Sequence, residues 1–388
     1  MKKVYWRPRA VSRMALSIIA SLSVVGLLLV EFNRATVEQP YYKEKLAASK
    51  LAARCMAVIK EERLRRTPEY IDSEVDPTYS GLIGVAISSA TSTSGVLLAK
   101  QTSINPNFAA VFVEMLKEAG VQKSDTVAVG YSGSFPALNI CVEAAAETLE
   151  LRPIGISSAA ASQWGANLPD FLWLDMEKVL RDQGLISFRS VAASLGGVED
   201  RGLGMSEATR ATLKKGIERS GLPSIDSADF KDSVDKRMKI YSEQPAGSQV
   251  KAYINVGGGT TSVGKSLGKK LLHSGLNRRL PAKARNIDSV MTRFLKRQTP
   301  VIHLVRVNDL AQRYGLPVRT ELSIDTPQMP NVGEGQVFNR QQYNLWYAGA
   351  VLAAILLCLY AFIRSDWGFR IFQTSGRRKD SGHPEPMI

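Results

Sequence analysis

The chain is poor in the residues that hold metal ions and disulfide frameworks. Its 388 residues include only three histidines and three cysteines, and no two cysteines stand in a CxxC spacing. Zinc and iron sites need clusters of such ligands, so we predict no metal site, and we expect no cofactor. Cys55 and Cys141 leave two interpretations open, a single disulfide or two unpaired buried thiols, because one pair does not make a framework.

Acidic residues are scarce relative to basic ones, which gives a formal net charge of +14. Between residues 265 and 297 the sequence has ten lysines and arginines but a single acid, Asp288. Such a run can bind an extended polyanion in a salt-sensitive manner, form a solvated basic face, or lie against anionic lipid headgroups. The residues that we assign to anion binding in this run are Arg278, Arg279, Lys283 and Arg285.

Charged residues are missing altogether from two long apolar runs, 14–30 and 345–363. As helices, both are long enough to cross or nearly cross a bilayer core. Five basic residues precede the first run, and five follow the second. The positive-inside rule therefore predicts a protein of the cytoplasmic (inner) membrane with both termini in the cytoplasm and the intervening chain outside, where ATP is scarce. A cleaved signal peptide is the less favoured alternative for the first run, because no small-x-small cleavage site follows it.

Between the apolar runs, short apolar segments alternate with helical ones, which predicts an α/β domain around a mostly parallel sheet, held between two terminal transmembrane helices. The expected strands are 82–88, 126–131, 153–157, 171–174, 188–192, 251–256 and 301–305. The expected helices are 41–66, 107–119, 137–149, 206–219 and 286–296.

The predicted organisation has seven parts. They are a cytoplasmic basic tail (1–13), a transmembrane helix (14–31), a helical stalk or lead-in (32–80), an extracytoplasmic or periplasmic α/β domain (81–314), a polar linker (315–344), a second transmembrane helix (345–363) and a second basic tail (364–388). For the long helix expected at 41–66, a stalk and a first helix of the domain are equally good interpretations.

Three loops at predicted strand ends carry the candidate chemistry, because ligands of parallel α/β sheets gather beyond the carboxyl ends of the strands. In the first loop, 130–136, Ser132, Gly133 and Ser134 stand between a strand and a helix. Free backbone N–H groups there favour an anion, and Ser134 can simply cap the helix. Alternatively, Ser132 or Ser134 can act as a nucleophile, although the segment departs from the G-x-S-x-G elbow.

A serine nucleophile would need a base and a carboxylate. Asp175 is the best-placed acid, and His273 and His303 are the available bases. The order Ser, Asp, His is that of the α/β-hydrolases, but an order of three residues arises easily by chance. The second loop, 157–167, is rich in small residues that permit the close approach of a ligand.

The third loop, 257–266, contains a formal G-x-x-x-x-G-K-S motif after a predicted strand. Its outer location argues against ATP hydrolysis, and no strand ending in Asp follows it to help hold magnesium. Two interpretations remain: a tight packing turn, or a loop whose backbone N–H groups bind a carboxylate or phosphate. In the second case the binding residues are Gly257, Gly258, Gly259, Thr260, Thr261 and Lys265, together with Gly133 of the first loop.

The two-anchor layout and the segments 125–139, 162–167 and 255–264 resemble the poly-gamma-glutamate system protein family (PgsW-like) over essentially the whole chain. The resemblance implies a membrane component of a bacterial system that makes or exports poly-gamma-glutamate, a capsular or secreted polymer. In that family the partners are an ATP-dependent ligase and small membrane subunits. The resemblance assigns no catalytic residue.

We therefore expect a membrane-anchored accessory component whose outer domain binds the polyanionic polymer or the synthase and export subunits, with the lipid bilayer as a further partner. Nucleic acid fits the charge but not the compartment, so it is not expected as a partner. The alternative is an extracytoplasmic serine-dependent hydrolase or transferase that acts on the polymer.

Overall fold

The computed structural model describes residues 13–67, 71–243, 249–319 and 329–364, and these form two compact units. One unit contains the chain up to Val37 and from Arg340 onward, and the other is the domain Glu38–Asn339. The two predicted basic tails, 1–13 and 364–388, lie outside the described residues except for Arg13 and Arg364.

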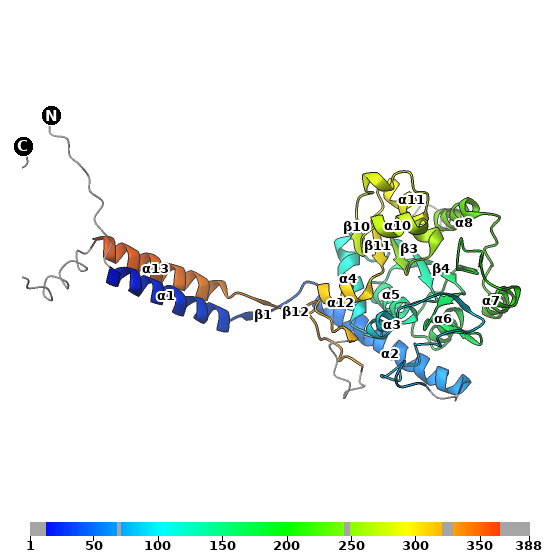
Figure 1. Ribbon diagram of the computed structural model, residues 1–388, viewed down its shortest axis with the longest axis horizontal. Helices are drawn as coiled ribbons and strands as arrows, with labels where there is room; N and C mark the ends of the chain where they lie inside the picture. Colours follow the sequence, from blue (N-terminus) through cyan, green and yellow to red (C-terminus); the bar gives the residue numbers. More distant parts are fainter. Residues whose placement is uncertain (1–12, 68–70, 244–248, 320–328, 365–388) are drawn as a thin grey trace, which may run out of the picture. The chain divides into compact units, whose positions relative to one another are not determined.

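The first unit is built on two apolar helices, α1 (Arg13–Phe32) and α13 (Leu345–Arg364), which lie side by side (Figure 1). Each contains an 18-residue stretch long and apolar enough to cross a membrane. Most of their large apolar side chains are exposed, as a surrounding hydrocarbon phase would require. Gly26 of α1 lies directly against Val351 of α13, so the absence of a side chain there lets the two backbones approach.

The domain begins and ends at neighbouring strands. β1 (Ala35–Glu38) pairs with β12 (Asn339–Gln342), and the Gln39 N–H donates to the Phe338 carbonyl oxygen over 2.8 Å. The chain therefore enters and leaves the domain at one place.

The domain alternates helices and strands along most of its length. Its first half contains α2 (Tyr42–Arg66), β2 (Thr91–Thr93), α3 (Leu97–Ser103), α4 (Phe108–Glu118), β3 (Thr126–Ser132), α5 (Pro136–Thr148), β4 (Arg152–Ser158), β5 (Ala161–Ser162), β6 (Asn167–Leu168), β7 (Phe171–Leu172) and α6 (Trp173–Asp182). Its second half contains β8 (Ala192–Ser194), α7 (Glu207–Ser220), α8 (Phe230–Glu243), β9 (Ala252–Val256), α9 (Thr260–Val263), α10 (Lys265–Leu271), β10 (Gly275–Asn277), the 3-10 turn η1 (Ala282–Ala284), α11 (Val290–Lys296), β11 (Val301–Leu304) and α12 (Val307–Arg313).

Six strands form one sheet in the order β10-β11-β9-β3-β4-β8. All neighbours are parallel except β10, which runs antiparallel to β11. The chain adds β4 and β8 on one side of β3, then returns to place β9 and β11 on the other side. This is a doubly wound sheet, and its strand order reverses between β3 and β9.

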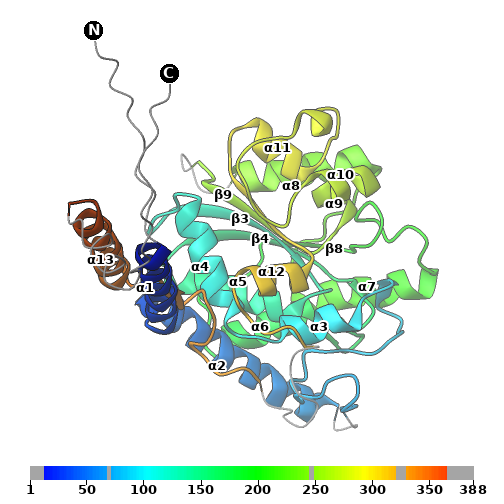
Figure 2. The ribbon, with the colours of Figure 1, turned by 60° about the vertical axis from the view of Figure 1, so that its left-hand side comes forward.

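Alternate residues of each strand face the two sides of the sheet. On β3, Val127, Val129 and Tyr131 join a core with helices α2, α4, α5, α6 and α12, whereas Ala128 joins a second core with α8, α9 and α11. Figure 2 shows these two sets of helices on opposite faces of the sheet. In the second core, the rings of Tyr253 and Phe294 stack 4.8 Å apart, and Tyr241 packs against both.

The structure confirms the mixed α/β class, the mostly parallel sheet and the strands expected at 126–131, 153–157, 251–256 and 301–305. The strand predicted at 82–88 is wrong. There, Val85 exchanges backbone hydrogen bonds with the Asn167 side chain, which takes the place of a strand partner.

Two other predicted strands are misplaced. At 171–174 only Phe171 and Leu172 are extended, because Asp175 accepts the Leu172 N–H and begins helix α6. At 188–192 the strand starts only at Ala192. The helix expected at 286–296 also starts late, at Val290, since Ser289 forms the N-cap.

The compact domain is wider than the predicted 81–314. Helix α2 inserts Ala52, Cys55 and Ile59 into the main core, so it is a helix of the domain and not a free stalk. The predicted linker 315–344 likewise contributes Leu316 and Phe338 to that core. Apolar side chains spaced widely in a polar sequence are difficult to recognise as core residues.

The close packing of α1 against α13 predicts that Gly26→Ile separates them, because the added side chain would occupy the space of Val351. Spin labels at Phe32→Cys and Leu345→Cys, in a Cys358→Ala background in lipid nanodiscs, should report a longer and broader distance distribution. Gly349→Ile is the matched control, since an added Cβ there meets nothing within 4 Å. An unchanged distribution in Gly26→Ile would contradict packing through this glycine.

Candidate functional site

A cavity of about 790 Å³ lies beyond the carboxyl ends of the parallel strands. Ser132, Ser158 and Val256, the last residues of β3, β4 and β9, line it. Since α5 follows β3 into one core and α9 follows β9 into the other, the connections leave these neighbouring strands on opposite faces and open a crevice between them. This volume is typical of sites for small molecules.

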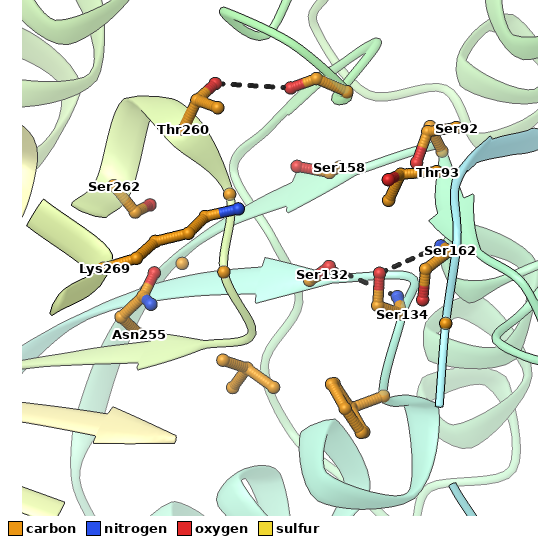
Figure 3. A pocket seen from close by; sticks show the side chains of 18 of the residues that line it. Ser92, Thr93, Ser132, Ser134, Ser158, Ser162, Asn255, Thr260, Ser262 and Lys269 are labelled. Carbon is orange, nitrogen blue, oxygen red and sulfur yellow. Dashed lines mark hydrogen bonds between the residues drawn. The ribbon is translucent and has the colours of Figure 1, made fainter. Parts of the chain in front are cut away.

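Hydroxyl groups dominate the polar part of the wall (Figure 3). The serines and threonines that line the cavity are Ser92, Thr93, Ser94, Ser132, Ser134, Ser158, Ser162, Thr260, Thr261 and Ser262. They come from all three of the predicted strand-end loops and from the segment around β2, so the fold brings the three loops together in one site.

The conformation of the first loop is fixed by contacts among its own residues and with neighbouring ones. Gly130 needs its lack of a side chain, because a Cβ atom there would lie 2.6 Å from the Tyr253 hydroxyl oxygen. The Ser134 N–H donates to Ser132 Oγ over 3.2 Å, and Asn139 Nδ2 donates to the Ser132 carbonyl oxygen over 2.9 Å. Ser134 is not the helix cap, since α5 starts after Phe135 with Pro136 at its first position.

The second loop packs on the first. The Ser162 N–H donates to Ser134 Oγ over 3.0 Å, as Figure 3 shows. Close backbone approach requires Gly133, where a Cβ atom would lie 3.0 Å from the Ala160 carbonyl oxygen. The small residues of this loop therefore serve contact between loops, and Ser158 and Ser162 face the cavity.

The third loop reaches the cavity through Gly258, Gly259, Thr260 and Thr261. Gly257 packs against Ser132 with a positive φ of 82°, a conformation that glycine adopts without strain. Thr260 Oγ1 accepts the Glu199 N–H over 2.7 Å. Thr261 is 2% exposed, and its hydroxyl has no hydrogen-bond partner among the described residues.

The lysine of the G-x-x-x-x-G-K-S motif points elsewhere. Lys265 Nζ lies 3.2 Å from Glu199 Oε1 and over the Phe230 ring, and Lys265 does not line the cavity. Lys269, one helical turn later, lines the cavity in its place (Figure 3). The end of its side chain lies close to Gly258. Arg306, which follows β11, is a second exposed cation of the wall.

Two more cations are buried in the wall. Arg237 donates to Asp200 and, over 2.8 Å, to Ser194 Oγ, and Ser194 donates to Asp200 over 3.0 Å. This cation is therefore already compensated. Lys100 of α3 is 3% exposed and donates to Ser162 Oγ over 2.8 Å and to the Ser134 carbonyl oxygen. Burial lowers the pKa of Lys100 from its ordinary 10.5 to about 7.

The predicted acid and bases lie apart from the two serines. Asp175 caps α6 and holds the Arg219 guanidinium over 2.7 and 2.8 Å. His303 lies within β11, where its Nδ1 is 3.0 Å from Asn255 Nδ2, and His273 is exposed. None of the three lines the cavity, and no hydrogen bond among the described residues joins one to Ser132 or Ser134.

The basic run also lies outside the cavity. Arg278, Arg279, Lys283 and Arg285 are exposed, and Arg278 donates to the Glu118 carbonyl oxygen. They form a charged surface and not a wall of the site. Cys55 and Cys141 are both free, buried thiols. Among the described residues, no group of three or more potential metal ligands occurs.

The residues that sequence reasoning missed are Lys100, Lys269, Arg306 and the stretch 92–95. Lys100 lies in the seven-residue helix α3, which follows the three-residue strand β2, and neither element was predicted from the sequence. Lys269 lies one helical turn beyond Lys265, the lysine of the motif, so the motif does not include it. Arg306 could have been predicted, because it directly follows the predicted strand 301–305 and residues at the carboxyl ends of parallel strands line ligand sites.

Comparison with protein-family models, with curated proteins and with solved structures finds no match at the threshold used for each.

Burial of His303 predicts a loss of stability in acid. Burial is the main cause that lowers its pKa from an ordinary 6.5 to about 4, with Arg306 contributing, so the folded state resists protonation. Asn255 Nδ2 also needs an unprotonated Nδ1 as acceptor. The contribution of His303 to the free energy of unfolding is therefore complete above pH 6.5. As the pH drops toward 4 this free energy falls by on the order of 3 kcal/mol.

Urea unfolding of the full chain between pH 7.5 and pH 4, followed by intrinsic fluorescence, measures this loss. In His303→Gln the decline should be shallower by that amount, whereas His273→Gln, at an exposed site, should keep the wild-type decline. Equal declines in His303→Gln and wild type would contradict the role of His303.

Proposed function

We propose that this protein is a membrane-anchored component whose Glu38–Asn339 domain binds a carboxylate-bearing polymer, with poly-gamma-glutamate as its ligand and α1 and α13 as its anchors. The observation that supports binding most strongly is the cavity itself. It combines ten serines and threonines with the cations Lys269 and Arg306, neither of which forms an ion pair among the described residues.

Carboxylates suit this wall for two reasons. Charge-assisted hydrogen bonds from lysine and arginine are the stronger ones that proteins make to oxyanions. The Thr261 hydroxyl, which is buried without a partner, needs a ligand atom or a water molecule to complete its bonding. A polar ligand with several acceptors satisfies both demands.

The size of the cavity limits how much polymer it holds. A volume of about 790 Å³ suits a few residues of a chain and not a long segment. The exposed basic surface around Arg278 and Lys283 supplies weaker, salt-dependent attraction for the rest of the polymer. Short-range recognition and long-range attraction are thus assigned to different parts of the domain.

The two apolar helices support anchoring in the cytoplasmic membrane, and the basic tails support an extracytoplasmic domain. In this arrangement both termini lie beside a cytoplasmic synthetase, and the domain meets the polymer as it emerges. The partners that we propose are accordingly the synthase and export subunits, the polymer and the bilayer.

Binding of a short γ-linked oligoglutamate to the full chain in nanodiscs, measured by calorimetry, tests the cavity. Lys269→Met and Arg306→Met should each weaken binding about tenfold or more, because each removes a charge-assisted hydrogen bond. Lys123→Met and Lys239→Met, at exposed sites paired with Glu150 and Glu243, should leave the affinity unchanged.

The basic surface gives the second arm of that test. Replacement of Arg278, Arg279, Lys283 and Arg285 by Ala should weaken binding of long polymer at low salt and lose its effect as salt is raised. Unchanged binding in the Lys269 and Arg306 variants would contradict recognition in the cavity. Unchanged binding of long polymer in the fourfold variant would contradict a role of the basic surface in binding.

The orientation predicts that a fluorescent reporter fused after Ile388 is active in the cytoplasm, whereas alkaline phosphatase fused there is inactive. The control is a fusion of each reporter after Arg340, which lacks α13 and should give the reverse result. Phosphatase activity after Ile388 would overturn the orientation.

A further inference from the structure

Lys100 and Ser162 form a contact that binding of a carboxylate does not require. The Lys100 ammonium nitrogen lies 2.8 Å from Ser162 Oγ and 3.8 Å from the centre of the Phe135 ring, and it also contacts the Ser134 carbonyl oxygen. Lys100 and Ser162 are 3% and 6% exposed, yet both line the cavity. The pair is therefore buried in protein on one side and faces the ligand space on the other.

The surroundings of Lys100 disfavour its charged form. No carboxylate pairs with it among the described residues, and both of its oxygen contacts are neutral. One contact acts the other way, because the Phe135 ring beneath the nitrogen attracts a cation. Phe135 is, however, also the N-cap of the 13-residue helix α5, where the helix dipole is positive. Burial of an uncompensated ammonium is costly, so the neutral amine, which can accept a proton as a base, is favoured.

The other charged groups of the cavity leave the pair undisturbed. Asp200 and Arg237 bond to each other, and Lys269, Arg306 and Asp309 form no hydrogen bond to Lys100 or Ser162 among the described residues. Lys100 is the sole charged residue of α3. Ser132 and Ser134, by contrast, have no basic side chain bonded to their hydroxyl groups in the part of the chain that is described.

We propose that Ser162 and Lys100 are a nucleophile and its general base, and that the cavity carries out acyl transfer on amide bonds of the carboxylate-bearing chain that it binds. Only the identity of the substrate rests on the proposed binding function. The geometry of nucleophile and base stands by itself, since it follows the pattern of serine–lysine acyl transfer.

The steps balance without any further reagent than water or an amine. In its neutral form Lys100 accepts the hydrogen bond from Ser162 in place of donating it, and Nζ takes the hydroxyl proton as Oγ bonds to the amide carbonyl carbon. The C–N bond then breaks, and the leaving nitrogen receives that proton from Lys100. Water, or the amine of another chain, next attacks the carbonyl carbon of the Ser162 ester and gives a proton to Lys100. The C–Oγ bond then breaks, Ser162 Oγ takes that proton back from Lys100, and the acyl group leaves as an acid or a new amide.

A fluorophosphonate probe on the full chain in nanodiscs tests the pair. We expect covalent labelling at Ser162, located by peptide mass spectrometry, with a rate that rises through pH 7 and then levels. Lys100→Met should slow labelling about 100-fold or more and remove the pH dependence. Lys100→Arg keeps the positive charge but cannot act as a base, so it should be equally slow. Lys123→Met, at an exposed lysine, should label like the wild type.

Each other outcome overturns the inference. Labelling at Ser132 or Ser134, or at no serine, excludes Ser162 as nucleophile, and an unchanged rate in a folded Lys100→Met excludes Lys100 as base. Folding of each variant is checked by its thermal unfolding. Calorimetry with oligoglutamate on the same preparations separates this result from the proposed function. Binding without labelling would contradict acyl transfer but would leave the proposed binding function standing.

Discussion

The reversal of strand order between β3 and β9 is the constraint on which the site depends. Neighbouring parallel strands normally send their connections to the same face, and the carboxyl edge is then closed. Here α5 and α9 leave to opposite faces, so the ends of two central strands stay uncovered. Every loop with candidate chemistry borders this gap. The position of the cavity is thus a property of the topology, whereas its chemistry comes from the loop residues.

The wall of the cavity and the cores below it differ in the kind of side chain they contain. Gly130 and Tyr253 lie at the boundary between the two. Because Gly130 of β3 has no side chain, the hydroxyl group of Tyr253 from the neighbouring strand β9 fits against its backbone. Beneath this level the side chains are apolar and tightly packed around Tyr253 and Phe294. Above it, hydroxyl groups and cations predominate, and two of the cations, Arg237 and Lys100, are almost fully buried. One of them has an acid beside it and the other has none, which marks Lys100 as the chemically exceptional residue.

Sequence patterns were reliable where a segment is regular and fully buried. The strands around Val129, Ile254 and Ile302 and the loops that follow them were predictable from apolar runs and small residues. The functional side chains were less so. Lys100 lies in α3, beyond the short strand β2 that was not predicted, and a G-x-x-x-x-G-K-S string drew attention to Lys265, which turns toward Glu199. A motif specifies residue types along the chain, but the direction of a side chain depends on the fold around it. The predicted linker did not look like core because Val337 and Phe338 are only two apolar residues within a polar stretch.

The pairing of β1 with β12 gives the architecture a modular character. Because the chain enters and leaves through adjacent strands, the domain is an insertion at a single point between two helices that pack on each other. An insertion with neighbouring ends can be exchanged or lost without a change in the helices that flank it. The helix pair and the domain are therefore free to diverge at different rates, and the same pair of helices could present an unrelated domain in another chain.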